Sequence, residues 1–120
     1  MAKVLIVEDD AVIADGMARH LAAAGFDPVV TPRGDQGLAR LRFENPDVVV
    51  LDLMMPVLSG WDVLQEREHD PELRPIPVII VSANRDPEVA LAVDKGICAF
   101  LPKPFDIGAL SALVKTCLPG

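Results

Sequence analysis

The chain has 120 residues, of which 51% are hydrophobic and 24% charged, and it carries a formal net charge of -7. A chain of this length can bury a single core, and its composition is that of a globular protein rather than a disordered one. The negative charge argues against binding to nucleic acid or to an anionic membrane, because such surfaces display clustered Lys and Arg. We therefore expect one domain over residues 1–120, with no direct contact to nucleic acid or membrane.

The two cysteines, Cys98 and Cys117, match neither a CxxC redox pair nor the spacing of zinc ligands. We interpret them as small buried hydrophobic side chains. No apolar run reaches the roughly 18 to 20 residues that cross a bilayer, and the apolar N-terminus is too short for a signal sequence. These observations predict a reduced, cytoplasmic compartment.

Apolar runs alternate with amphipathic segments along the chain. Strands are predicted at residues 3–7, 26–30, 47–51, 77–82 and 98–101. Helices are predicted from residue 11 to the stop at Gly25, and at residues 34–43, 59–69, 86–96 and 106–118. The alternation of five strands with five helices predicts an α/β fold, in which a doubly wound parallel sheet is covered by helices on both faces.

Single residues refine this outline. In the first helix Ile13, Met17 and Leu21 recur every four residues and form the face expected to be buried. Asp10 or Asp9 is expected to cap the same helix. For Asp10, a role as helix cap is favoured over a role as metal ligand. The second strand contains Pro28, which cannot donate a hydrogen bond to a neighbouring strand, so this strand is expected at an edge of the sheet.

Four of the five predicted strands end on polar or charged residues. These are Glu8 with Asp9, then Asp52, Ser82 and Lys103. In an open α/β sheet all carboxyl ends of the strands lie along one edge, where ligands bind. The fold alone therefore predicts three carboxylates, a hydroxyl and an ammonium group in one crevice.

Three carboxylates at such an edge repel one another, at a cost on the order of 4 kcal/mol for each pair at 4 Å. A hard divalent cation offsets this repulsion, and Mg²⁺ binds one or two carboxylates while it bridges to phosphate oxygens. With Lys103 and Mg²⁺ present, the formal charges of the cluster sum to zero. An ionised Asp beside a metal can attack phosphorus, so the cluster predicts a phosphoryl-accepting site centred on Asp52.

In these features the chain resembles the receiver domain of response regulators in two-component signalling, over essentially its whole length. The resemblance implies a flavodoxin-like fold with strand order 2-1-3-4-5, as in single-domain chemotaxis regulators. It is carried by short motifs that follow the strands, namely Glu8-Asp9, Asp52, the MPVLSG segment with Pro56 and Gly60, Ser82-Ala83, and Lys103-Pro104-Phe105.

The resemblance also implies roles for the residues at the sheet edge. Asp52 is similar to the phosphoacceptor, and Lys103 to the lysine that contacts the phosphoryl group. The bond from Lys103 to Pro104 is expected to be cis. The implied Mg²⁺ ligands are Asp9, Asp52 and the backbone carbonyl of Met54, with Glu8 acting through a metal-bound water.

Two further positions are similar to the switch of the family, in which a hydroxyl reaches the phosphoryl group while an aromatic ring turns inward. Ser82 supplies the hydroxyl and Phe100 the ring, although Phe100 as a simple core residue is the rival interpretation. Met54 and Asn84 occupy positions that tune the lifetime of the phosphoryl group. The chain departs from the commoner family pattern in having Glu8 instead of Asp, and Phe100 instead of Tyr.

The partners implied by the resemblance are a histidine kinase or phosphotransfer protein as donor, and a protein target or a removed output domain downstream. Phosphorylation is expected to change binding or dimerisation at the face formed by the last strand and the last two helices. The chain would be no enzyme beyond its own phosphorylation and dephosphorylation.

Other functions fit the sequence less well. A phosphatase of the haloacid-dehalogenase type needs an acid two residues after its nucleophile, where this chain has Met54. A degenerate receiver that only binds proteins should lack an acid or the lysine, and none is missing. A flavodoxin or dinucleotide site needs a Gly-rich or hydroxyl-rich loop after the first strand, where this chain is acidic. His20 and His69 have no partner at the spacing of metal ligands, so no functional role is assigned to them, and Trp61 is interpreted as a packing residue.

Overall fold

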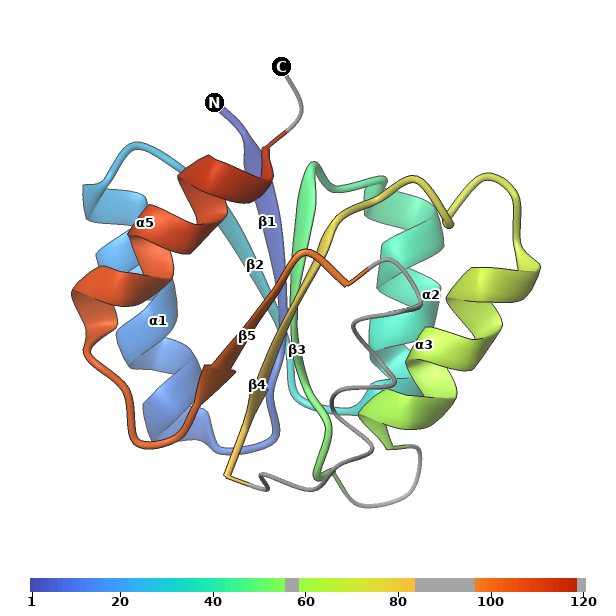
Figure 1. Cartoon of the computed structure of the whole chain (residues 1–120), viewed down its shortest axis with the longest axis horizontal. Helices are drawn as coiled ribbons and strands as arrows, with labels where there is room; N and C mark the ends of the chain where they lie inside the picture. The colour runs from blue at the N-terminus through green and yellow to red at the C-terminus, as the bar shows by residue number, and fades with distance from the viewer. Residues whose placement is uncertain (56–58, 84–96, 119–120) are drawn as a thin grey trace.

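The computed structural model describes residues 1–55, 59–83 and 97–118 of the chain. Five parallel strands form one sheet in the order β2-β1-β3-β4-β5 (Figure 1), so the predicted fold class and strand order are confirmed. The strands are β1 (Lys3–Val7), β2 (Asp27–Thr31), β3 (Val48–Asp52), β4 (Val78–Ser82) and β5 (Ala99–Pro102).

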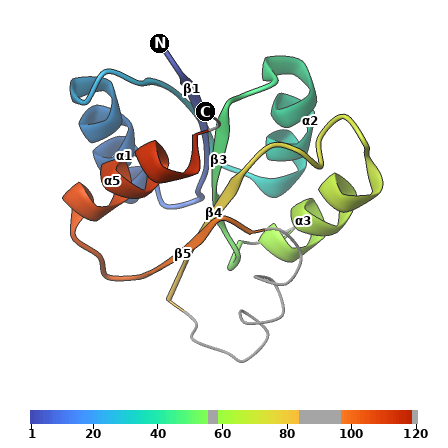
Figure 2. The same ribbon diagram turned by 45° about the horizontal axis from the view of Figure 1, so that its top comes forward.

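Helices cover both faces of the sheet, with α1 and α5 on one face and α2 and α3 on the other (Figures 1 and 2). The helix predicted at residues 86–96 lies outside the described residues. The four described helices agree with their predicted positions to within one or two residues: α1 (Ala11–Ala23), α2 (Gly34–Glu44), α3 (Gly60–His69) and α5 (Ile107–Cys117).

The core has two halves because each face of the sheet buries its own set of apolar side chains. β1, β3 and β4 contribute to both halves, since successive residues of a strand point to opposite faces. Met17 and Leu21 of α1 are fully buried as their spacing predicted, whereas Ile13 is only half-buried. The central strands are therefore fixed on both faces, and their carboxyl ends are held in place.

The strand and helix ends also follow the predicted local chemistry. β2 lies at the sheet edge, where the missing N–H of Pro28 costs no hydrogen bond between two strands. The Asp10 side chain caps α1 by accepting hydrogen bonds from the backbone N–H groups of Val12, at 3.0 Å, and Ile13, at 3.2 Å. The helix thus uses Asp10, and Asp9 remains available at the sheet edge.

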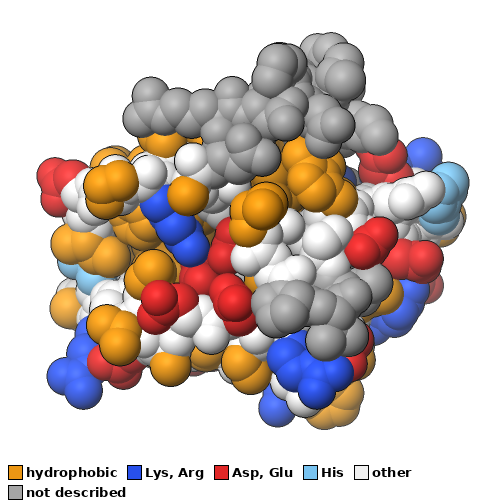
Figure 3. All heavy atoms as spheres, turned by 90° about the horizontal axis from the view of Figure 1, so that it is seen from below, with side chains coloured by type: hydrophobic (Ala, Val, Ile, Leu, Met, Phe, Trp, Pro, Cys, Tyr) orange, Lys and Arg blue, Asp and Glu red, His pale blue; other side chains and the backbone are white. Residues whose placement is uncertain are grey.

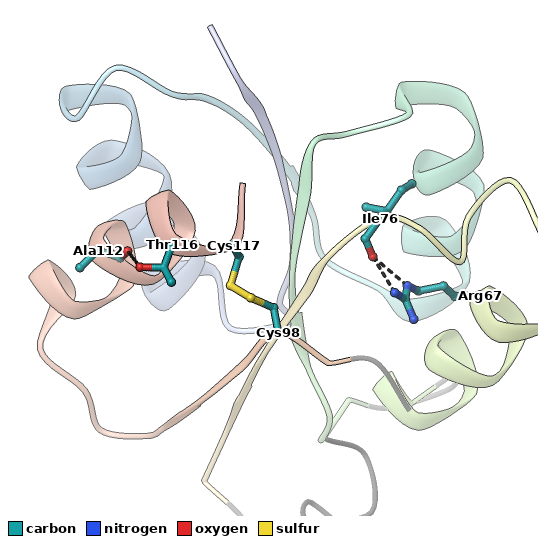
Figure 4. Close-up of a disulfide and its surroundings, with 6 residues drawn as sticks. All are labelled: Arg67, Ile76, Cys98, Ala112, Thr116 and Cys117. Carbon is teal, nitrogen blue, oxygen red and sulfur yellow. Dashed lines mark hydrogen bonds between the residues drawn. A yellow bond between two sulfur atoms is a disulfide. The ribbon is translucent and has the colours of Figure 1, made fainter. Parts of the chain in front are cut away.

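The interpretation of the two cysteines is wrong. Cys98, directly before β5, and Cys117, the last residue of α5, form a disulfide with their Cα atoms 5.9 Å apart (Figure 4). Cys98 is moreover exposed. α5 runs back along the sheet to the level where β5 begins, so the two cysteines meet there although they are distant in sequence. A comparison with the short spacings of CxxC pairs and zinc ligands cannot detect such a pair.

Because disulfides persist mainly in oxidising surroundings, the two cysteines no longer support the prediction of a reduced compartment. In the part of the chain that the structure describes, no helix is long and apolar enough to cross a membrane.

A buried arginine holds the connection between α3 and β4. Arg67, which is 3% exposed, donates from Nε and Nη2 to the Ile76 carbonyl oxygen at 3.0 and 2.7 Å (Figure 4). Its Nη2 also donates to the Arg74 carbonyl oxygen at 2.7 Å. Burial lowers the pKa of the Arg67 guanidinium. The side chain thus satisfies backbone carbonyls in a connector whose prolines, Pro71, Pro75 and Pro77, have no N–H to donate.

We predict that Arg67→Ala lowers the free energy of unfolding by about 2 to 4 kcal/mol, because it leaves buried carbonyl groups without donors and opens a cavity. Urea denaturation measures the change. Arg42→Ala is the matched control, since Arg42 is half exposed, contacts Asp70 at 3.5 Å and should change stability by less than about 1 kcal/mol. Equal effects of the two substitutions would contradict a structural role for Arg67.

Candidate functional site

Three carboxylates converge where β1 and β3 end. Glu8 and Asp9 follow β1, Asp52 is the last residue of β3, and one carboxylate oxygen from each lies within 4.8 Å of the others. Glu8 and Asp52 are 1% and 4% exposed, whereas Asp9 is exposed to solvent. Figure 3 shows acidic side chains gathered at the centre of this face, beside a basic side chain. The predicted convergence of the three acids is confirmed.

Lys103 reaches this cluster from the end of β5. Its Nζ donates to Glu8 Oε2 at 2.8 Å and to Asp52 Oδ2 at 3.3 Å. The Lys103 backbone N–H donates to the Ser82 carbonyl oxygen at 2.9 Å, and the bond to Pro104 is cis as predicted. The two side-chain contacts place the ammonium group between the two buried acids.

The electrostatics of the cluster follow from burial and close charges. Burial, assisted by the charge of Asp52, raises the pKa of Glu8 to about 7, although the bond from Lys103 acts in the opposite direction. Burial by itself lowers the pKa of Lys103, but the hydrogen bond to Glu8 and the charge of Asp52 outweigh it, and the net direction is upward. Lys103 thus stays charged at neutral pH, while Glu8 is close to the point where it takes up a proton.

Both oxygens of Asp52 are oriented. Oδ2 accepts from Lys103, and Oδ1 accepts from the Met54 backbone N–H at 3.0 Å. Sequence reasoning missed this role of the Met54 amide, although an Asp that accepts from the N–H two residues later is a common turn geometry. The contact of the Met54 carbonyl with a metal stays a prediction.

Gly60 begins α3 directly against the backbone of the acidic strand end. Its N–H donates to the Leu53 carbonyl oxygen at 3.2 Å. A Cβ atom at Gly60 would lie 2.7 Å from Leu53 Cα and 2.9 Å from the carbonyl carbon of Asp52, and closer still to the Asp52 carbonyl oxygen. These neighbours are backbone atoms and cannot rotate away, so only glycine fits here. Sequence reasoning named Gly60 only as part of the MPVLSG segment and missed this contact.

The predicted switch residues lie on the neighbouring strands β4 and β5. Ser82 ends β4, is fully buried and stands opposite Pro102 of β5. Phe100 of β5 is half-buried and packs against the core half on the α2 and α3 face. Asn84 lies outside the described residues, so its role, like those of Ser82 and Phe100, stays a prediction.

An apolar groove of about 400 Å³ runs from the cluster along α1 and the connection between β5 and α5. Lys103 lies at the acidic end of this groove. Val12, on its α1 side, is 82% exposed, and Ile107, on its α5 side, is 37% exposed. The remaining lining residues are Ile13, Gly16, Met17, Ala83, Pro104 and Phe105.

Comparison with known proteins agrees with this geometry. The family model of the response regulator receiver domain matches residues 4–115. The chain belongs to the response regulator receiver family. The family is that of the receiver domains of two-component response regulators, which is consistent with phosphorylation-dependent switching.

Solved receiver domains resemble the chain over nearly its whole length. The receiver domain of the Francisella response regulator 1452 is 32% identical, with a TM-score of 0.89, and the match covers 98% of this chain and 96% of that one. The chemotaxis protein CheY4 of Vibrio cholerae is 26% identical, with a TM-score of 0.90, over 98% of this chain and 99% of that one.

Among curated proteins, the DNA-binding dual master transcriptional regulator RpaA of a Synechocystis species is 33% identical over 119 residues, which is 98% of this chain. The match covers 49% of RpaA. The receiver chain therefore spans about half the length of this relative, whose name describes it as DNA-binding.

We predict that Gly60→Ala destabilises the receiver by at least about 1 to 3 kcal/mol, because the added Cβ collides with the Asp52 backbone. The same change should slow phosphorylation of the chain, since it displaces the acid. Urea denaturation and the rate of labelling by acetyl phosphate measure the two effects.

Gly16→Ala is the control for Gly60→Ala, because a Cβ at Gly16 of α1 meets no atom within 4 Å. The control should raise stability by about 0.5 to 1 kcal/mol through helix propensity. A Gly60→Ala protein as stable as this control would exclude the close approach.

Proposed function

We propose that the chain is a phosphorylation-activated signalling switch that accepts a phosphoryl group on Asp52 from a histidine kinase or a phosphotransfer histidine. The observation that carries this proposal is the position of Asp52, buried at the end of a central strand, beside two further acids and 3.3 Å from Lys103. A buried acid in a cluster of like charges is costly in a merely structural role. Membership of the receiver family supports the same function.

The oxygen donors of the cluster fit Mg²⁺, which prefers carboxylates and waters. Asp9, Asp52 and the Met54 carbonyl would hold the ion, and Glu8 would contact it through a bound water. When bound, the ion neutralises charge on the transferring phosphoryl group. The exposure of Asp9 leaves this side of the cluster open to solvent.

The transfer itself uses the orientation of Asp52. One carboxylate oxygen forms a bond to phosphorus while the bond between phosphorus and the donor's imidazole nitrogen breaks, and the imidazole takes up a proton. The Met54 amide orients one carboxylate oxygen, and Lys103 holds the other. Lys103 then contacts a phosphoryl oxygen, because the modified residue carries more negative charge than the carboxylate did. The chain catalyses no reaction besides its own phosphorylation and dephosphorylation.

The donor must bring its histidine to the edge of the cluster, and the apolar groove beside Lys103 offers a surface for it. Val12 and Ile107 expose apolar area next to the acceptor, where a helical segment of the donor would pack. A donor segment seated there would carry its histidine toward Asp52.

The response to phosphorylation runs through Ser82 and Phe100. The Ser82 hydroxyl moves to the phosphoryl group, and the Phe100 ring, half-buried in the unmodified chain, turns further inward. Met54 and Asn84 tune the lifetime of the modified state. The surface that changes comprises β5, α5 and the helix predicted at residues 86–96.

The changed surface acts on a downstream protein, on an output domain attached to the receiver, or on a second copy of the chain through phosphorylation-dependent dimerisation. Relatives of about twice the length, among them RpaA, carry names that describe DNA binding. We assign no DNA contact to residues 1–120 themselves, which form one receiver domain, and we place its action in the cytoplasm.

We predict that Asp52→Asn abolishes the Mg²⁺-dependent gain of one phosphoryl group from acetyl phosphate, because an amide oxygen is too weak a nucleophile. Mass spectrometry of the intact protein measures the gain. The matched control is Asp10→Asn, which makes the same change at a helix cap where Asn serves as well as Asp. Labelling of the Asp52→Asn protein at the rate of the control would refute the assignment of Asp52.

A further inference from the structure

We propose that the Cys98–Cys117 disulfide is a redox-controlled clamp that opens by exchange with a small thiol and thereby loosens the end of α5 from β5. The clamp would thereby control the response surface, which is the surface of β5 and α5 proposed to change on phosphorylation. This control rests on the proposed function, whereas the opening of the clamp itself does not. No residue of the phosphoryl site takes part in the exchange.

The disulfide closes a covalent ring around the response surface. Cys98 immediately precedes β5 and Cys117 ends α5, at a sequence separation of 19. Between them the ring contains Phe100 and Lys103, so the predicted switch aromatic and the lysine of the acidic cluster belong to one closed segment. Figure 4 shows the disulfide spanning from the start of β5 to the end of α5. With the clamp closed, β5 and α5 can move only together at this end.

The rest of α5 is held without the disulfide. The Asp106 side chain caps the helix by accepting from the Gly108 N–H at 3.1 Å, and Leu110 is fully buried. Ser111 Oγ lies 3.0 Å from Nε2 of His20, which joins α5 to α1. Opening the clamp therefore releases only the last turn of α5, and the domain is expected to stay folded.

The two sulfur-bearing residues differ in access, which sets the order of the exchange. Cys98 is exposed, whereas Cys117 is 7% exposed and packs in the core half beneath α5. A thiolate of the reductant attacks the Cys98 sulfur and forms a mixed disulfide, while the Cys117 sulfur leaves as a thiolate and takes a proton from water. A second reductant thiol then releases Cys98. In total, two reductant thiols are oxidised to one disulfide, and the protein disulfide is reduced to two thiols.

The redox state changes how freely the response surface moves. In the oxidised chain the end of α5 cannot separate from the start of β5, so a movement at this end must involve both elements. In the reduced chain the last turn of α5 can shift alone. We expect the reduced receiver to show the larger change at α5 upon phosphorylation.

The first experiment compares amide hydrogen exchange of the oxidised wild type, the dithiothreitol-reduced wild type and the Cys98→Ser/Cys117→Ser variant. Reduction should speed exchange at residues 114–118 by at least about tenfold and leave β1 and β3 unchanged, because only a local opening is involved. The double variant should show the exchange rates of the reduced protein, and dithiothreitol should not change them. The clamp would be overturned if residues 114–118 exchange equally fast in both redox states, or if dithiothreitol does not reduce the disulfide of the folded protein. It would also be overturned if reduction lowers protection in β1 as much as at residues 114–118.

The second experiment repeats the exchange measurement after labelling with acetyl phosphate and Mg²⁺. The phosphorylation-induced change at residues 107–118 should be larger in the reduced than in the oxidised protein. If labelling occurs but this change is the same in both states, control of the response surface is refuted while the proposed function stands. If neither state is labelled, the proposed function fails, and with it the control of that surface, while the first experiment still decides the clamp.

Discussion

The ammonium group of Lys103 lies between two buried carboxylates, and the arrangement of the site depends on this contact. Without it, Glu8 and Asp52 would face each other as buried acids with no nearby cation among the described residues. Removing one partner from a buried charge pair typically costs about 3 to 5 kcal/mol, because the remaining charge stays buried. Lys103 makes the cluster of three acids less costly, yet it leaves two negative charges in excess, which suits a site for a divalent cation and a phosphoryl group.

The backbone holds these charges in place. Parallel pairing puts the ends of β1 and β3 side by side, burial on both faces fixes the strands, and Gly60 lets α3 begin against Asp52. The helix that follows β1 takes its cap from Asp10, so the acids of one short segment divide between structure and site. The site is thus a consequence of where strands end, and its precision comes from a few close backbone contacts.

Much of this architecture could be predicted from the sequence, because the signals are local. Runs such as Val48–Asp52 are apolar on both faces, and the proline in β2 marks an edge strand. The convergence of Glu8, Asp9, Asp52 and Lys103 follows from topology alone. The Cys98–Cys117 pair, the packing of Gly60 on Asp52 and the burial of Arg67 could not be predicted, since each depends on how two distant elements approach in space.

The central claim is that the three acids repel one another until a cation binds. The most direct test compares the unfolding free energies of the wild type and the Asp52→Asn variant, with and without Mg²⁺. Without Mg²⁺ the variant should be the more stable protein by roughly 1 to 3 kcal/mol, because one repelling charge is gone. Mg²⁺ should stabilise the wild type and have much less effect on the variant. A wild type that is the more stable protein without Mg²⁺, and an equal effect of the ion on both, would contradict the account.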